Sequence, residues 1–222
     1  MTTLSLEPMD LAALLCSRVC HDLISPVGAI MNGLEVLDDE KDGGMGMRDI
    51  AIDLIRKSAS GASAKLKFCR LAYGAAGSAG ATIDTGDAEA VARGLLVTER
   101  VSMQWNGARL LLPKNKVKLL LNLAQMAAGS IPRGGVLTVD ILGDNEAATF
   151  TITAKGVNAK IQPHFADLIR GDGHGPIDGH SIQPYYTNLV ARECGLNVEI
   201  VTEPETLTFV THATAARETS VA

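Results

Sequence analysis

The chain has 222 residues, with 20 Lys and Arg against 25 Asp and Glu, a net charge of −5 and an isoelectric point near 5.5. This length suits one large domain or two small ones, and the acidic balance argues against nucleic acid as a partner. The four cysteines follow neither a zinc spacing nor a secreted disulfide framework. Because no signal peptide and no run of about 20 apolar residues is found, we expect a soluble cytoplasmic protein without a membrane partner.

The first predicted element is an amphipathic helix from about Leu6 to Asp38. Its apolar residues are spaced by threes and fours, which places them on one face of a helix. They are Leu11, Leu15, Val19, Leu23, Val27, Ile30, Leu34 and Leu37. His21 stands midway between Val19 and Leu23, so at about 100° per residue its side chain points away from this face and toward water.

Asp22 and Pro26 set His21 apart from an ordinary surface histidine, which is what most exposed histidines are. A proline inside a helix costs about 3 kcal/mol or more. Here it would free the carbonyl of Asp22 and bend the helix beside His21. The Asp22 carboxylate can orient the neighbouring ring and fix which nitrogen is free. An oriented imidazole on the wet face of a helix suits a nucleophile that a large partner must reach.

A polar stretch with glycines at 39–44 predicts a loop, and a second helical pattern follows as far as Tyr73. Two long helices with a short loop form an antiparallel hairpin. Since two helices cannot enclose a core, we expect a homodimer in which two hairpins form a four-helix bundle. At the level of His21 the second helix carries Lys65 and two further basic residues. They form either a solvated basic face or a positive collar that docks an acidic pocket or a phosphate.

Small residues at 74–81 predict a linker between a hairpin domain, residues 1–77, and a second domain, residues 82–222. The second domain mixes helical and strand patterns. We expect helices at 89–97, 114–129, 163–170 and 182–194, and strands at 101–105, 136–142, 148–153, 198–201 and 206–211. This order predicts an α/β sandwich with helices over one face of a mixed sheet, so the fold class of the whole chain is α+β.

The stretch His21-Asp22-Leu23-Ile24-Ser25-Pro26 resembles the phosphoacceptor box of sensor histidine kinases, which lies on the first helix of a dimeric hairpin. The second domain resembles their ATP-binding domain. Residues 119–124 with 131–135 are similar to the kinase N box, and Gly195-Leu196 matches the usual end of the last helix.

The nucleotide-handling residues of these kinases are missing from the matching positions. Met126 stands where the kinases have a magnesium-binding asparagine, and Ala154 where their aspartate reads adenine. Asn158 replaces a glycine, and residues 180–185 lack the glycine pattern of the phosphate loop. Backbone amides cradle phosphate only where glycine lets them come close, so the resemblance implies no ATP binding and no cofactor. Asn122 of the N box remains, which we interpret as a capping or surface amide.

A phosphorylatable histidine without an ATP site resembles the ChpT-type histidine phosphotransferases of alphaproteobacteria, as does the stretch 183–186. The resemblance implies a dimeric phosphorelay protein. Phosphoryl would pass from a receiver-domain aspartate of a hybrid histidine kinase to His21, and from there to the receiver domains of response regulators. Asp22 would hold the ring, and Mg²⁺ would belong to the receiver, so this chain would need no metal of its own.

Receiver docking should use exposed residues around His21, and our candidates are Ser17, Arg18, Ser25 and Lys65. The other histidines, His164, His174, His180 and His212, are expected in or near loops or the tail, away from the reaction. Two alternatives stay open: a non-catalytic scaffold that binds a receiver, and an active histidine kinase.

Overall fold

The computed structural model describes residues 5–38, 45–74, 80–173 and 175–214. In chain order its elements are α1 (Pro8–Asp38), α2 (Met45–Ala72), β1 (Thr82–Asp84), α3 (Thr85–Leu96), β2 (Val101–Asn106), β3 (Leu111–Pro113), α4 (Lys114–Gly129), β4 (Gly135–Leu142), η1 (Asn145–Ala147), β5 (Thr149–Lys155), α5 (Pro163–Arg170), α6 (Ile182–Glu193), β6 (Leu196–Glu203) and β7 (Thr206–Ala213). The expected loop at 39–44 and the linker residues 75–79 lie outside the described residues.

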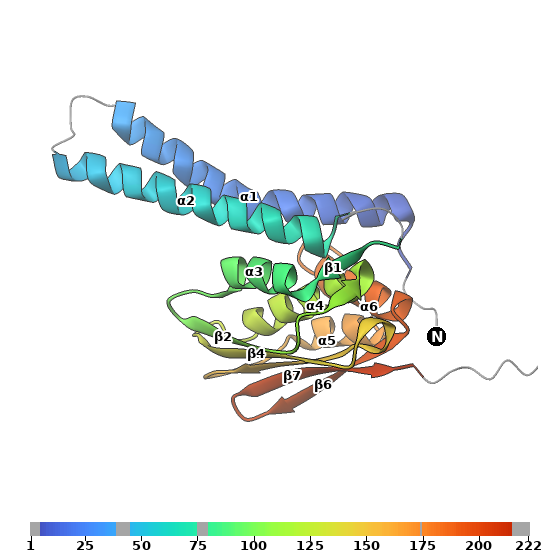
Figure 1. The fold of residues 1–222 in the computed structure, drawn as a ribbon. Helices are drawn as coiled ribbons and strands as arrows, with labels where there is room; N and C mark the ends of the chain where they lie inside the picture. Colours follow the sequence, from blue (N-terminus) through green and yellow to red (C-terminus); the bar gives the residue numbers. More distant parts are fainter. Residues whose placement is uncertain (1–4, 39–44, 75–79, 174, 215–222) are drawn as a thin grey trace, which may run out of the picture.

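The helices α1 and α2 form the expected antiparallel hairpin, which lies along one side of the second domain (Figure 1). Gly33 lets the two helices approach closely. A Cβ atom there would come within 2.6 Å of Cγ1 of Ile55 and 3.2 Å of the Ala51 carbonyl oxygen. Pro26 lies inside α1, and the helix changes direction between its two halves (Figure 1), as an internal proline leads us to expect.

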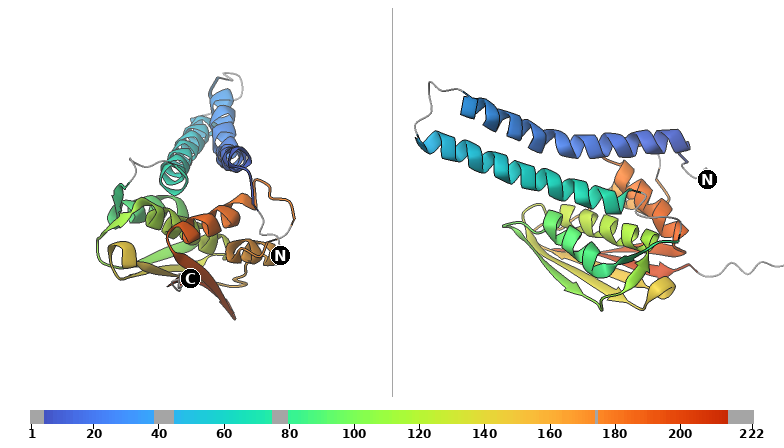
Figure 2. Two further views of the ribbon diagram at one scale, coloured as in Figure 1. Left: turned by 90° about the vertical axis from the view of Figure 1, so that its right-hand side faces the viewer. Right: turned by 45° about the horizontal axis from the view of Figure 1, so that its top comes forward.

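The second domain is a five-stranded mixed sheet in the order β2-β4-β5-β7-β6, in which β2 runs parallel to β4 and the other neighbours are antiparallel. Its helices form a layer between the sheet and the hairpin (Figure 2). The α+β class and the sandwich are therefore confirmed, and α4 and α5 have the predicted bounds. The sequence patterns missed β1 and β3, which pair with each other but have only three residues each.

The base of the hairpin shares its core with the second domain. Leu11 and Leu15 of α1 pack against a cluster that contains Leu168, Ile182 and Tyr185. On α2, three buried residues belong to the main core of the second domain: Phe68, Leu71 and Ala72. The first part of the predicted apolar face of α1 is thus covered by α5 and α6, because these helices stand beside the N-terminal turns of α1.

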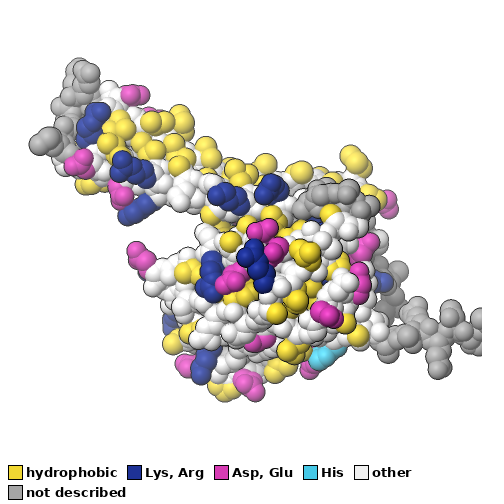
Figure 3. All heavy atoms as spheres, in the orientation of Figure 1, with side chains coloured by type: hydrophobic (Ala, Val, Ile, Leu, Met, Phe, Trp, Pro, Cys, Tyr) yellow, Lys and Arg dark blue, Asp and Glu magenta, His cyan; other side chains and the backbone are white. Residues whose placement is uncertain are grey.

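The distal half of the hairpin is different, because its apolar side chains remain exposed. Val27 and Leu34, which belong to the predicted apolar face, are 49% and 42% exposed in the single chain. With their neighbours they form what we call the apolar seam: Ile24, Val27, Met31 and Leu34 on α1, and Met47, Ile50 and Leu54 on α2. The spacing within the seam is three and four residues on both helices, which is the pattern of a helix face that packs against another helix. Figure 3 shows hydrophobic side chains gathered on this part of the hairpin.

By length and composition α1 is also apolar enough to cross a membrane, with a mean hydropathy of 1.3 over its most apolar window. From the sequence we expected no such segment. The middle of α1, however, carries Arg18 and Asp22, and charged groups are costly inside a bilayer. Leu11 and Leu15 also pack on the second domain. The apolar character of α1 is therefore divided between a covered base and the exposed seam.

Candidate functional site

His21 stands on an exposed stripe of α1. Its side chain is 65% exposed, as predicted from its position opposite the apolar face. Ser17 and Ser25, one helical turn before and after it, are exposed too. Because both neighbours on this stripe are small, the imidazole is accessible to a large partner that approaches from the solvent.

The Asp22 carboxylate lies between His21 and Arg18. Its Oδ1 is 3.5 Å from Nδ1 of His21, and its Oδ2 accepts a hydrogen bond from Nε of Arg18 at 3.2 Å. A carboxylate facing Nδ1 favours the tautomer that carries its proton there, which leaves the lone pair on Nε2. The nitrogen that faces away from Asp22 is then the nucleophilic one.

Lys65 of α2 satisfies the carbonyl that Pro26 leaves open. Proline has no N–H to donate, so the Asp22 carbonyl oxygen loses the helical hydrogen bond that residue 26 would otherwise supply. Lys65 Nζ donates a hydrogen bond to this oxygen at 2.7 Å. Lys65 therefore lies beside the His21 region of α1, as expected. Its ammonium group, however, is part-buried and binds the backbone carbonyl of Asp22 at the kink. The kink next to His21 is fixed by a contact across the hairpin.

Replacing Lys65 with Met should lower the free energy of unfolding by about 1 kcal/mol, because the part-buried Asp22 carbonyl loses the charged donor that Lys65 provides. Urea denaturation measures the change, with Lys67→Met, an exposed lysine two residues on, as the control. In a Pro26→Ala background the residue at 26 regains an N–H for the Asp22 carbonyl, so Lys65→Met should cost much less there. Equal losses in both backgrounds would contradict this role of Lys65.

Arg18 is less exposed than we expected for a residue that docks a receiver. Its side chain is only 18% exposed. Besides its contact with Asp22, Nη1 of Arg18 donates a hydrogen bond to the carbonyl oxygen of His180 at 3.4 Å. The guanidinium group thus connects the hairpin to the second domain, because the loop before α6 is held against this part of α1.

His180 is the site residue that sequence reasoning missed. We expected it to lie away from the reaction, yet its ring packs on that of His21, with centroids 5.1 Å apart and planes at 78°. The backbone beside it follows the same stripe of α1, since a Cβ atom on Gly179 would lie 3.6 Å from Oγ of Ser17. No local pattern reveals such a contact, because the two histidines come from different domains.

Asp178 shapes the turn that presents His180. Its Oδ1 accepts hydrogen bonds from the backbone N–H groups of His180 and Ser181 and from the hydroxyl of Ser181. The bonds from Ser181 hold the pKa of the Asp178 carboxyl below its usual value. Since the folded-state pKa is lowered, these bonds are fully present at neutral pH and are lost only as the pH falls through that lowered value.

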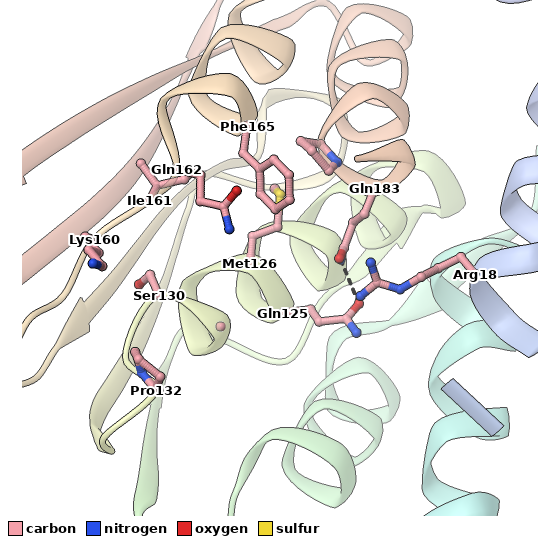
Figure 4. Close-up of a pocket in the computed structure, with 12 residues that line it drawn as sticks. Arg18, Gln125, Met126, Ser130, Pro132, Lys160, Ile161, Gln162, Phe165 and Gln183 are labelled. Carbon is pink, nitrogen blue, oxygen red and sulfur yellow. Dashed lines mark hydrogen bonds between the residues drawn. The ribbon is translucent and has the colours of Figure 1, made fainter. Parts of the chain in front are cut away.

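A pocket of about 440 Å³ opens in the second domain among α4, α6 and residues 160–165, and Arg18 of α1 lies at one end of it. Figure 4 shows Met126 and Phe165 facing its interior, with Arg18 and Gln183 at the end near the hairpin. Lys160 and Ser130 line the opposite end. Met126 thus stands in the pocket at the position of the expected magnesium ligand, and a thioether is a poor ligand for that hard cation.

A buried amide network closes the pocket toward the hairpin. Nε2 of Gln183 donates to Oε1 of Gln125 at 2.7 Å and lies 3.4 Å from Oδ1 of Asn122. Nδ2 of Asn122 in turn donates to the carbonyl oxygen of Ala72, at the end of α2. Asn122 is fully buried, so it is not a surface amide, but it does act as a capping amide because it satisfies the carbonyl of the last residue of α2. It connects α2 to the second domain.

The other positions of the lost kinase motifs also have structural roles. Ala154 is fully buried on β5, and Asn158 adopts a left-handed backbone with φ of 61°, a conformation that asparagine tolerates better than most residues. The stretch that matches the phosphate loop contains the start of α6, whose residues 182–187 are buried. Packed side chains therefore occupy the place of a flexible glycine-rich loop.

The part of the chain that the structure describes holds no group of three or more His, Cys, Asp or Glu side chains arranged to bind a metal ion. Cys16 and Cys20 are exposed on α1, one turn apart. Burial raises the pKa of the Cys69 thiol, and the nearby Asp22 charge raises it further. A raised pKa keeps this thiol protonated and unreactive at neutral pH.

Comparison with known proteins gives three findings. The family described as "Histidine phosphotransferase C-terminal domain" matches residues 85–206. The "Protein phosphotransferase ChpT" of Brucella abortus (strain 2308) is 50% identical over 206 residues, which cover 92% of this chain and 96% of the relative. The solved structure of a bacterial phosphotransferase superposes with a TM-score of 0.86 at 47% identity, covering 96% of this chain and 100% of that one.

Proposed function

Since the chain belongs to the histidine phosphotransferase family and is a phosphorelay histidine phosphotransferase, we propose that His21 is the residue that carries the phosphoryl group. The observation that supports this assignment is the exposed imidazole whose Nδ1 faces a carboxylate, on a helix kink held by Lys65. A preset ring with one free nitrogen is what attack on a bulky phosphorylated protein requires.

In the proposed step, Nε2 of neutral His21 attacks the phosphorus of a receiver's aspartyl phosphate, in line with the bond from phosphorus to the leaving aspartate oxygen. The N–P bond forms as the bond between phosphorus and the aspartate oxygen breaks, and the aspartate leaves as a carboxylate. The ring becomes positively charged, and Asp22 stabilises that charge from the Nδ1 side. The reverse step delivers the phosphoryl to a second receiver. Magnesium belongs to the receiver, so we propose no cofactor for this chain.

Family membership implies two-component partners, and we propose receiver domains of a hybrid histidine kinase and of response regulators. They would dock on the stripe of α1 that contains Ser17, His21 and Ser25. The part-buried cations Arg18 and Lys65 would add a positive field near the receiver's acidic pocket rather than direct rim contacts. We propose that the exchange takes place in the cytoplasm.

We propose a homodimer in which the apolar seams of two hairpins meet in a four-helix bundle. The support is the exposed seam itself, since an exposed apolar face of this extent on both helices is typical of an interaction surface. A second copy presents the same spacing on the same two helices, so each seam can cover the other.

The transfer reaction itself is tested with a receiver that carries a labelled aspartyl phosphate. We expect the label on this chain, and mapping of the phosphopeptide at neutral pH should place it on His21. A stable complex without label would favour the scaffold, whereas labelling directly from ATP would favour a kinase. Either result would replace the proposed function.

We also predict no binding of ATP at millimolar concentration and no autophosphorylation. The reason is that Met126 cannot replace an oxygen ligand for magnesium, and that Ala154 has no acceptor for an adenine amino group. Packed residues of α6 stand where backbone amides would have to approach the phosphates. Titration calorimetry with ATP and magnesium is the measurement. A saturable dissociation constant in the micromolar range would contradict the prediction and revive the kinase.

A further inference from the structure

The second domain contributes a side chain to the phosphoacceptor site. On the basis of the proposed function, we propose that His180 is a positioning residue for phosphotransfer: its ring holds the imidazole of His21 in the orientation that presents Nε2 to the receiver. The observation that carries this inference is the perpendicular packing of the two rings, with centroids 5.1 Å apart.

The His21 ring is restricted from two directions. Asp22 faces its Nδ1 atom at 3.5 Å, and the ring of His180 stands at 78° to its plane. An imidazole on an exposed helix surface would otherwise sample several rotamers, of which few point the free nitrogen at a docked phosphorus atom. Holding the ring in one orientation raises the fraction of encounters that are productive, which is the orientational part of catalysis.

The turn that carries His180 is anchored, so the ring can act as a fixed support. The His180 carbonyl accepts a hydrogen bond from Arg18, and Gly179 lies beside Ser17 on the same stripe of α1. Within the turn, the Asp178 carboxylate accepts hydrogen bonds from the backbone N–H groups of His180 and Ser181. These contacts involve the backbone of the turn, so they persist when the side chain of His180 is changed.

The ring of His180 has no evident structural task in its own domain. His180 is exposed, and within the described residues its side chain makes no hydrogen bond. Its ring packs against the ring of His21. Substitution of this side chain should therefore leave the core intact, so an effect on transfer can be separated from an effect on folding.

The test compares His180→Ala with His180→Phe in transfer from a phosphorylated receiver under single-turnover conditions. His180→Ala removes the ring, and the maximal rate should fall on the order of tenfold while the half-saturating receiver concentration stays unchanged. His180→Phe keeps an aromatic ring beside His21, so it should restore most of the rate. His212→Ala is the matched control, because His212 is an exposed histidine of the same domain that pairs with Glu199 on the sheet.

A spectroscopic arm reports on the ring contact directly. The ring protons of His21 should shift in the NMR spectrum of His180→Ala and remain near their wild-type positions in His180→Phe, since an adjacent aromatic ring shifts them. Asp178→Ala, which loosens the turn but leaves both rings in place in the sequence, should also slow transfer.

The outcomes separate the inference from the proposed function. If the wild-type chain takes no label on His21, the proposed function is wrong and this inference with it. If the wild type is labelled and His180→Ala transfers at the same maximal rate, only the inference is overturned. If His180→Phe transfers as slowly as His180→Ala, the inference is also overturned, because an aromatic ring at position 180 would then not be sufficient to position His21.

Discussion

His21→Ala should take no phosphoryl group from a phosphorylated receiver and should still fold as the wild type does. The loss is expected to be complete, because no other side chain on this stripe of α1 offers a nitrogen nucleophile. The imidazole is 65% exposed, so its removal should change the free energy of unfolding by no more than about 0.5 kcal/mol. Labelling from the receiver measures the first effect, and urea denaturation the second.

The matched controls are His164→Ala and His212→Ala, which replace histidines on α5 and β7. Both should be labelled at the wild-type rate. His180 cannot serve as a third control because its ring touches that of His21. Labelling of the His21→Ala protein at a rate near that of the wild type would refute the assignment of the phosphoacceptor.

The double substitution Met31→Glu and Leu54→Glu should convert the protein into a folded monomer. Both side chains belong to the apolar seam and are 53% and 41% exposed in the single chain, so the charges are solvated there. Covered by a second hairpin, they would be buried without partners, at a cost of several kcal/mol per group. Light scattering coupled to size exclusion should show a dimer for the wild type and a monomer for the variant.

Leu142→Glu is the control for this experiment. Leu142 is 63% exposed, but it lies on β4 in the second domain, so the added charge should leave the dimer unchanged. Circular dichroism should show the same helix content for all three proteins. A wild-type chain that is already monomeric at micromolar concentration would exclude the four-helix bundle.

The features that could be predicted from the sequence are those that depend on local pattern. Apolar spacing gave the hairpin and the outward direction of His21, and helix lengths placed Lys65 at the correct level on α2. The missing nucleotide residues could also be recognised by position, and Met126 does face the pocket.

The features that were missed depend on how the two halves of the chain meet. His180 reaches His21 only because α1 rests on the loop before α6, and Arg18 turns inward for the same reason. Asn122 is buried because the last turn of α2 offers it the Ala72 carbonyl. Hydrophobic periodicity carries no information on which distant elements will touch, so these roles required the three-dimensional arrangement.

The shared core at the base of the hairpin has a consequence for how this protein can be dissected. Phe68, Leu71 and Ala72 are packed inside the second domain, and the buried amide of Asn122 holds the chain at Ala72. A fragment cut at the small-residue linker would expose these side chains to water and leave that amide unpaired. The hairpin that bears His21 and the sheet domain are therefore expected to unfold as one cooperative unit. The second domain therefore supports the helix that carries His21.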